Sequence, residues 1–171
     1  GYVTHKSVES VLEKEEDFDY ILCIRFSKIL KGDILSAPEK AAINFHGSLL
    51  PKYAGLGSVF QALYHNEQQI GGSFHLMVEK IDAGKVIAQS RMDIDYSKSV
   101  SFHHLLVYTQ SSHILGQAID NLVTENYVGT DASEIDYHSF PEKQELKQFK
   151  HRLMTLGDVF SAAHLFSENR M

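Results

Sequence analysis

Three polar side chains of different chemistry follow two apolar segments of the sequence. Asn44 and His46 stand at the end of the apolar run 41–45, and Asp82 begins a turn after the alternating segment 72–78. An amide and an imidazole can donate hydrogen bonds to an oxyanion, and a carboxylate can accept a proton. These residue types suit acyl transfer to an amine without a covalent intermediate, because the amine itself attacks the carbonyl carbon.

Each of these residues also has an ordinary structural explanation. A lone His near a strand end is more often structural, Asn before a loop often binds the backbone, and Asp-Ala-Gly is often only a turn. A metal site is a further alternative, because His46, His75 and Asp82 are of the types that bind zinc with an open position for water. Their spacing matches no familiar zinc motif, so we expect no metal.

The segments around these residues predict an α/β sheet, mostly parallel, with an antiparallel part. Short apolar or alternating runs predict strands over residues 20–24, 41–45, 72–78 and 85–94. Apolar stripes and charged segments predict helices over residues 7–16, 29–35, 58–65, 142–152 and 159–166, and one long helix over 99–122. Ligands of such sheets bind at the carboxyl ends of the strands, which is where Asn44 and His46 fall.

The composition is that of a single globular domain. The chain has 171 residues, of which 43% are hydrophobic and 22% charged, and the single cysteine, Cys23, allows no internal disulfide. The net charge of -6 disfavours sequence-independent binding to nucleic acid. No apolar stretch reaches the roughly 20 residues that span a bilayer, and no signal peptide is recognisable. We therefore expect a cytoplasmic protein with neither membrane nor nucleic acid as a partner.

Residues 43–93 resemble the catalytic stretch of the 10-formyltetrahydrofolate-dependent formyltransferases. The sequence reads Asn44-Phe45-His46-Gly47-Ser48-Leu49-Leu50-Pro51-Lys52-Tyr53-Ala54-Gly55, then Gly72-Ser73-Phe74-His75, then Ile81-Asp82-Ala83-Gly84. In order and spacing it is similar to that family's pattern of Asn-x-His, Ser-Leu-Leu-Pro, an aromatic-Gly turn, His and Asp-x-Gly. The resemblance extends over residues 4–122.

The resemblance implies a Rossmann-like fold of the formyltransferase type with C-terminal helices, and four active-site residues. Asn44 and His46 would stabilise the oxyanion, Asp82 would orient a water or take the amine proton, and His75 would support Asp82. The formyl donor would be 10-formyltetrahydrofolate. Its pocket would be formed by Phe26, Lys28, Ile29, Leu30, Leu35, Val78, Glu79 and Ile81. Residues 1–126 would form the catalytic domain and residues 127–171 a C-terminal helical extension.

The family normally has more chain before the first residue of this sequence. Two strand–helix units are absent, roughly 60 residues at about 30 per unit, together with a Gly-rich loop for the acceptor's phosphate. The strand over residues 20–24 would then be an apolar edge that is prone to pairing with another chain. The chain is a fragment, or the protein is truncated, or another chain in an oligomer completes the sheet.

The acceptor is a small amine by elimination. The turn from Lys52 to Gly55 lacks the Arg often found in tRNA and many sugar-nucleotide enzymes, and Ser111 stands where glycinamide ribonucleotide enzymes tend to place an acidic residue. We lean towards an amino sugar attached to a nucleotide. The alternatives are a hydrolase that uses water against the same formyl donor, and a folate-binding remnant without activity.

Overall fold

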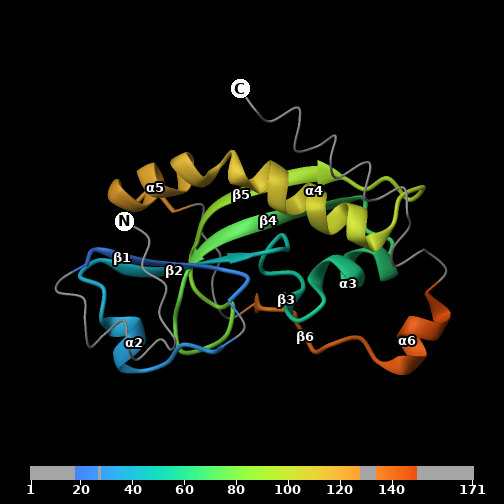
Figure 1. Ribbon diagram of the computed structural model, residues 1–171, viewed down its shortest axis with the longest axis horizontal. Helices are drawn as coiled ribbons and strands as arrows, with labels where there is room; N and C mark the ends of the chain where they lie inside the picture. Colours follow the sequence, from blue (N-terminus) through green and yellow to red (C-terminus); the bar gives the residue numbers. More distant parts are fainter. Residues whose placement is uncertain (1–17, 27, 128–133, 150–171) are drawn as a thin grey trace.

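A four-stranded sheet forms the centre of the computed structural model, which describes residues 18–26, 28–127 and 134–149 (Figure 1). β1 and β2 are parallel, whereas β4 is antiparallel to both β2 and β5. The predicted α/β class with a parallel and an antiparallel part is confirmed. Among the described strands of this sheet, however, two of the three pairs are antiparallel, so the sheet is not mostly parallel as predicted. The strands, in the order β1-β2-β4-β5, are β1 (Tyr20–Ile24), β2 (Ala41–His46), β4 (Gln69–Leu76) and β5 (Val86–Asp93).

The inner strands β2 and β4 carry the centre of the core. Phe45 of β2 and Phe74 of β4 are buried, with their ring centroids 5.0 Å apart. Phe45 also lies against the β4 backbone, where a Cβ on Gly72 would overlap its ring. This close approach requires glycine at position 72. It fixes the direction of β2 at the residues on either side of Phe45, which are Asn44 and His46.

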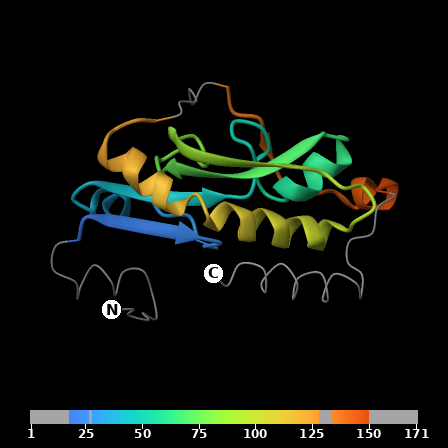
Figure 2. The same cartoon turned by 90° about the horizontal axis from the view of Figure 1, so that it is seen from above.

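Helices α4 (Val100–Ser112) and α5 (Leu115–Val123) follow one another along the sheet (Figures 1 and 2). Both helices pack against β5, and α4 also packs against β4 and α3 (Ser58–Tyr64). The Ser99 hydroxyl caps α4 by accepting the Phe102 N–H at 3.1 Å. These helices bury the apolar side chains Val107, Ala118 and Leu122 against the core.

The prediction of one long helix over residues 99–122 is wrong, because the helix breaks between Ser112 and Leu115. The Ser112 hydroxyl donates to the Thr109 carbonyl at 2.6 Å, and the His113 N–H bonds instead to the Gln110 carbonyl. Serine hydroxyls that compete for backbone carbonyls weaken the regular α-helical pattern. The break changes the direction of the chain so that α5 continues over β5.

The helix predicted over residues 29–35 is shorter than expected and begins later. It is the single turn α2 (Asp33–Ser36), which packs against β2. Gly32 precedes it with φ at 53° and ψ at -127°, a conformation outside the helical region. The helix therefore cannot extend back to Ile29 and Leu30, and these residues lie in an irregular segment that follows β1.

Residues 134–149 join the domain through a second, two-stranded sheet. β6 (Tyr137–His138) pairs in parallel with β3 (Ala54–Gly55), and α6 (Lys143–Gln148) follows. The helices predicted over 7–16 and 159–166 lie outside the described residues, and the division at residue 126 stays a prediction. Among the described helices, none has the length and apolar character needed to cross a membrane.

Candidate active site

The site is built where β2 and β4 lie side by side. Asn44 and His46 alternate along β2 and so point to the same side of the strand. His75 of β4 is the register partner of Asn44. The Asn44 Nδ2 atom lies 3.1 Å from His75 Nε2. The antiparallel pairing of the two strands therefore brings together two residues that are 31 positions apart in the sequence.

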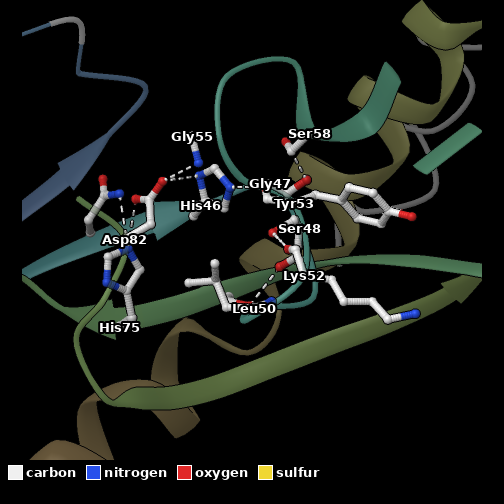
Figure 3. A network of polar contacts seen from close by, with 12 residues as sticks. His46, Gly47, Ser48, Leu50, Lys52, Tyr53, Gly55, Ser58, His75 and Asp82 are labelled. Carbon is white, nitrogen blue, oxygen red and sulfur yellow. Dashed lines mark hydrogen bonds and ion pairs between the residues drawn. The ribbon is translucent and has the colours of Figure 1, made fainter. Parts of the chain in front are cut away.

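Asp82 lies between the two imidazole rings (Figure 3). Its Oδ2 atom is 3.4 Å from His46 Nδ1, and its Oδ1 atom is 3.4 Å from His75 Nε2. The Gly55 N–H donates to Oδ2 at 2.8 Å, and the Asp82 side chain is only 7% exposed. Asp82 has φ at 52°, which is uncommon for a residue other than glycine. Such strain is found preferentially at functional sites.

The loop that follows β2 supplies two backbone groups to this site. The Tyr53 carbonyl accepts a hydrogen bond from His46 Nε2 at 2.9 Å, and Gly55 provides the N–H that reaches Asp82. Gly55 has φ at 91°, and a Cβ there would overlap the His138 carbonyl of β6. The aromatic-Gly turn of the sequence motif thus orients the His46 ring and the Asp82 carboxylate, and it leaves room for β6.

Buried hydroxyls hold this loop in place. The Ser73 hydroxyl donates to the Ser48 carbonyl at 2.6 Å and accepts the Leu50 N–H at 3.1 Å. Gln89 donates to the Leu50 carbonyl at 2.8 Å and to Ser73 at 3.0 Å. The Ser48 hydroxyl in turn donates to the Lys52 carbonyl at 2.8 Å. The Ser-Leu-Leu-Pro motif therefore has a structural role, because its hydrogen bonds hold the turn at Tyr53 in place.

The backbone contacts decide where each imidazole can take up a second proton. A carbonyl can only accept, so the Tyr53 carbonyl fixes a hydrogen on His46 Nε2, and the Leu76 carbonyl, 2.9 Å away, fixes one on His75 Nδ1. The remaining nitrogen of each ring is the one that faces Asp82. Any further proton on either ring is therefore placed between that ring and the carboxylate.

The charge states of the cluster follow from burial and from these contacts. Burial opposes the ionisation of Asp82, but its contacts with the His75 ring, the His46 ring and the Gly55 N–H together hold its pKa below the usual value. Burial lowers the pKa of His46, although Asp82 and the Tyr53 carbonyl act in the opposite direction. An ionised Asp82 beside a neutral His46 is an arrangement that can accept a proton at neutral pH.

A cavity of about 580 Å³ opens beside this cluster. All four predicted catalytic residues line it, and so do all the predicted folate-binding residues except Leu35. Leu35 is half-buried in α2 and does not line the cavity, because the helix begins only after Gly32. The predicted folate-binding residues in the wall are Phe26, Lys28, Ile29, Leu30, Val78, Glu79 and Ile81.

The zinc alternative has no geometric support. Within the described ranges, no group of three or more His, Cys, Asp or Glu side chains is arranged to hold a metal ion. In the trio His46, His75 and Asp82, each ring turns one nitrogen to a backbone carbonyl and the other to the carboxylate. The three side chains therefore bond to one another and to the backbone.

The sequence did not reveal three further residues of the cavity wall, which are Arg25, His104 and Tyr108. Arg25 directly follows β1, and its place at the carboxyl end of a parallel strand is a signal that could have identified it. His104 and Tyr108 come from α4, where the helical pattern alone does not tell a cavity residue from a core residue. The neighbouring His103 is fully buried and bonds to the Ser99 carbonyl at 2.7 Å, which makes it structural.

Comparison with known proteins places these residues in a family. The family model described as formyl transferase matches residues 4–119. The methionyl-tRNA formyltransferase of Staphylococcus aureus is 31% identical over 125 residues, which are 72% of this chain and 40% of that protein. The chain thus spans about 40% of the length of the curated relatives that it matches.

Solved structures of sugar-modifying enzymes share the fold. A sugar N-formyltransferase from a Shewanella species superposes with a TM-score of 0.64 at 18% identity, covering 98% of this chain and 67% of that one. A formyltransferase from Anoxybacillus kamchatkensis, in complex with UDP-4,6-dideoxy-4-formamido-L-AltNAc and tetrahydrofolate, gives 0.65 at 17% identity, covering 87% and 75%. The motif residues that meet around Asp82 lie within the matched segment, and the chain belongs to the formyl transferase family.

Proposed function

We propose that this chain carries the active site of a folate-dependent formyltransferase that acts on a small amine. The observation that carries the proposal is the convergence of Asn44, His46, His75 and Asp82 on one wall of a 580 Å³ cavity. Membership of the formyl transferase family supports the reaction class. The solved structure of the Anoxybacillus enzyme contains tetrahydrofolate, which supports 10-formyltetrahydrofolate as the donor.

The donor's pterin would occupy the part of the cavity that is lined by residues 26, 28–30, 78, 79 and 81. Its apolar side chains are Phe26, Ile29, Leu30, Val78 and Ile81. A flat heteroaromatic ring is held best between apolar faces, with polar groups at its edges. Lys28 and Glu79 also lie in this wall, and Glu79 Oε1 accepts the Gly32 N–H at 2.9 Å. Leu35 does not line this pocket.

The reaction uses the hydrogen-bonding groups that the cluster leaves available. The amine nitrogen attacks the formyl carbon, and the carbonyl oxygen takes up the electron pair as an oxyanion. Asn44 uses one amide N–H towards His75 and has a second N–H for the oxyanion. His46 Nδ1 gains a proton only when the cluster takes one from the amine; because Nδ1 is 3.4 Å from Asp82, longer than an ordinary hydrogen bond, that proton can also reach the oxyanion.

The same cluster moves the proton that the amine must lose. Asp82 accepts it directly or through a water, and it is then held between the carboxylate and His46 Nδ1, because His75 Nε2 already accepts the Asn44 N–H. When the tetrahedral intermediate collapses, the bond between the formyl carbon and the donor nitrogen breaks. That nitrogen takes the stored proton and leaves as part of tetrahydrofolate, so atoms and charge balance.

Among amines, we propose an amino sugar attached to a nucleotide. The sugar nucleotide named with the Anoxybacillus enzyme supports this class. The net charge of -6 disfavours tRNA, whose backbone requires a basic surface.

An acceptor screen tests the proposal. The 171-residue chain would be incubated with 10-formyltetrahydrofolate, with and without amines, while tetrahydrofolate, formate and formamide products are measured. Formamide that forms only with an amine supports transfer. Release of formate without any amine would identify a hydrolase instead. Binding of tetrahydrofolate in calorimetry with no turnover under either condition would mean a binding remnant.

A further inference from the structure

Arg25 occupies a strained position at the edge of the active-site cavity. It directly follows β1, and because Ile24 pairs with Phe45, Arg25 and His46 are the next residues along the two parallel strands. Its φ is 53°, in the left-handed region that residues with a Cβ seldom adopt. Glycine would adopt this conformation without cost. An arginine at such a position points to a use for its side chain.

The Arg25 guanidinium lies over an aromatic ring and forms no ion pair with a carboxylate of the described residues. Its central carbon lies 5.4 Å from the centroid of the Tyr108 ring. The ion pairs found among the described residues do not include Arg25, although two carboxylates, Glu79 and Asp82, line the same cavity. Glu79 instead accepts the Gly32 N–H, and Asp82 is occupied by the imidazoles. The five donors of the guanidinium are therefore available to a ligand.

Tyr108 connects this cation to the catalytic strand. Its ring packs edge-on against Phe45, with centroids 5.1 Å apart. Its hydroxyl would lie 4.0 Å from a Cβ on Gly47, the residue after His46. Within the described residues, the Tyr108 hydroxyl has no hydrogen-bond partner. It is a second donor on the same side of the cavity as Arg25.

His104 adds a third polar group without a partner. It stands one helical turn before Tyr108 on α4 and lines the same cavity. Its Nδ1 atom is buried and has no hydrogen-bond partner among the described residues. Burial, and then the neighbouring Arg25 and His103, lower the pKa of His104, so its ring is neutral at neutral pH. An unsatisfied buried group beside a cavity calls for an explanation. Because Nδ1 is shielded from solvent, the His104 ring would turn to bring this atom to a ligand in the cavity.

We propose that Arg25, Tyr108 and His104 form a subsite for an anionic oxygen group, a phosphate or a carboxylate, on the acceptor amine. The inference rests on the proposed formyl transfer, and it adds that the acceptor amine carries a negatively charged group. A planar guanidinium recognises such groups with paired hydrogen bonds. Arg25, Tyr108 and His104 line the same cavity as Asn44, His46 and the proposed folate wall. An acceptor anchored by its anion would present its amine to the formyl group between them.

Calorimetry with inorganic pyrophosphate and with malonate tests the subsite without any turnover. Arg25→Gly removes the cation and relieves the positive φ, so this variant keeps its fold. We expect it to bind the preferred anion about ten- to a hundredfold more weakly than the wild type does, which is the usual effect of losing a charged hydrogen bond. Arg25→Lys should restore part of the affinity, and Tyr108→Phe should weaken binding while keeping the ring.

Lys98→Ala is the matched control. Like Arg25, Lys98 is an exposed cation over an aromatic ring, with its Nζ atom 5.6 Å from the Phe102 centroid, but it does not line this cavity. Pyrophosphate binding alone would indicate a phosphate-bearing acceptor, and malonate binding alone a carboxylate. Anion binding that is absent from the wild type, or equal in the wild type and Arg25→Gly, would overturn the inference.

Kinetics separate this inference from the proposed function. For an amine that carries the preferred anion, Arg25→Gly should raise KM with little change in kcat, and for an uncharged amine it should change neither. If no amine is formylated but Arg25-dependent anion binding is measured, the proposed reaction fails and the subsite stands. If amines are formylated and Arg25→Gly leaves every KM unchanged, the subsite fails and the reaction stands.

Discussion

Asp82 is the residue on which both imidazoles of the site depend. Its carboxylate lies 3.4 Å from a nitrogen of each ring and accepts the Gly55 N–H. Asn has the same shape and can still accept from Gly55, but it cannot take a proton. We expect Asp82→Asn to remain folded, to bind tetrahydrofolate nearly as well as the wild type and to lose about a hundredfold or more in turnover. Calorimetry and a single-turnover assay measure the two effects; an unchanged rate would remove Asp82 from the mechanism.

The pH dependence of stability gives a second test of Asp82. Because the folded protein holds the pKa of Asp82 below its usual value, the unfolded chain binds more protons near pH ~4. The contribution of Asp82 is complete above this pH and is lost as the pH falls through the folded-state pKa. In urea titrations at about pH 7 and about pH 3, the wild type should lose more free energy of unfolding than Asp82→Asn. Equal losses would show that the folded protein does not favour the ionised form.

Asn44 tests the oxyanion donor separately from the proton acceptor. Asn44→Ala removes the amide N–H proposed for the oxyanion and also the contact with His75 at 3.1 Å. We expect the variant to fold and its turnover to fall by about a hundred- to a thousandfold, as is typical when one such donor is lost. Circular dichroism checks the fold and a formyl transfer assay the rate. Turnover near that of the wild type in a folded variant would rule out this role.

The four catalytic candidates could be predicted because they are side chains at recognisable spacings. Their partners could not, because the Tyr53 carbonyl and the Gly55 N–H are backbone groups that any residue carries. His46 shows the consequence. Its type suggests a free donor to an oxyanion, whereas the folded ring already uses Nε2 for Tyr53 and turns Nδ1 to Asp82.

At the scale of elements, the loop after β2 positions the site only while β4 holds it. Ser73 of β4 is fully buried and bonds to the Ser48 carbonyl, the Leu50 N–H and Gln89. Ser73→Ala would leave the Leu50 N–H without its partner, so we expect the free energy of unfolding to fall by about 1–3 kcal/mol. Urea denaturation measures this change.

Turnover should fall as well, because the loop carries Tyr53 and Gly55. Ser139→Ala is the control, since Ser139 is exposed and should change neither property. Equal stability of Ser73→Ala and the wild type would contradict the assigned role of this hydroxyl.

The elements themselves show which patterns in a sequence are decisive. All four strands of the main sheet were predicted, because short apolar or alternating runs bounded by turns are typical of strands. The two-residue strands β3 and β6 were not predicted. The break in the helix over 99–122 was not predicted, because the apolar spacing continues across it. The break depends on the Ser112 hydroxyl taking the Thr109 carbonyl, and on Ser111 bonding to Ser90 of β5 at 2.6 Å. The contact between Ser111 and Ser90 exists only once the sheet and the helix are together.

At the scale of the whole molecule, β1 ends the sheet with an apolar surface. It is the outer neighbour of β2, and its side chains Leu22 and Ile24 are 42% and 50% exposed. In the described part of the chain, the outer edge of β1 pairs with no other strand. An apolar edge strand of this kind favours pairing with a second polypeptide. We expect the 171-residue chain to associate as its concentration rises.

A charge at this edge should weaken the association. Ile24→Lys places an ammonium beside the unpaired backbone groups, where a partner strand would have to bury it. Ile119→Lys is the matched control, because Ile119 is 47% exposed on α5, away from the β1 edge. Sedimentation velocity over a range of concentrations should show weaker association for Ile24→Lys alone. Only Ile24→Lys alters the edge that a second strand would extend. A wild type that stays monomeric at all concentrations, or equal effects of the two lysine substitutions, would therefore mean that β1 does not form the contact between chains.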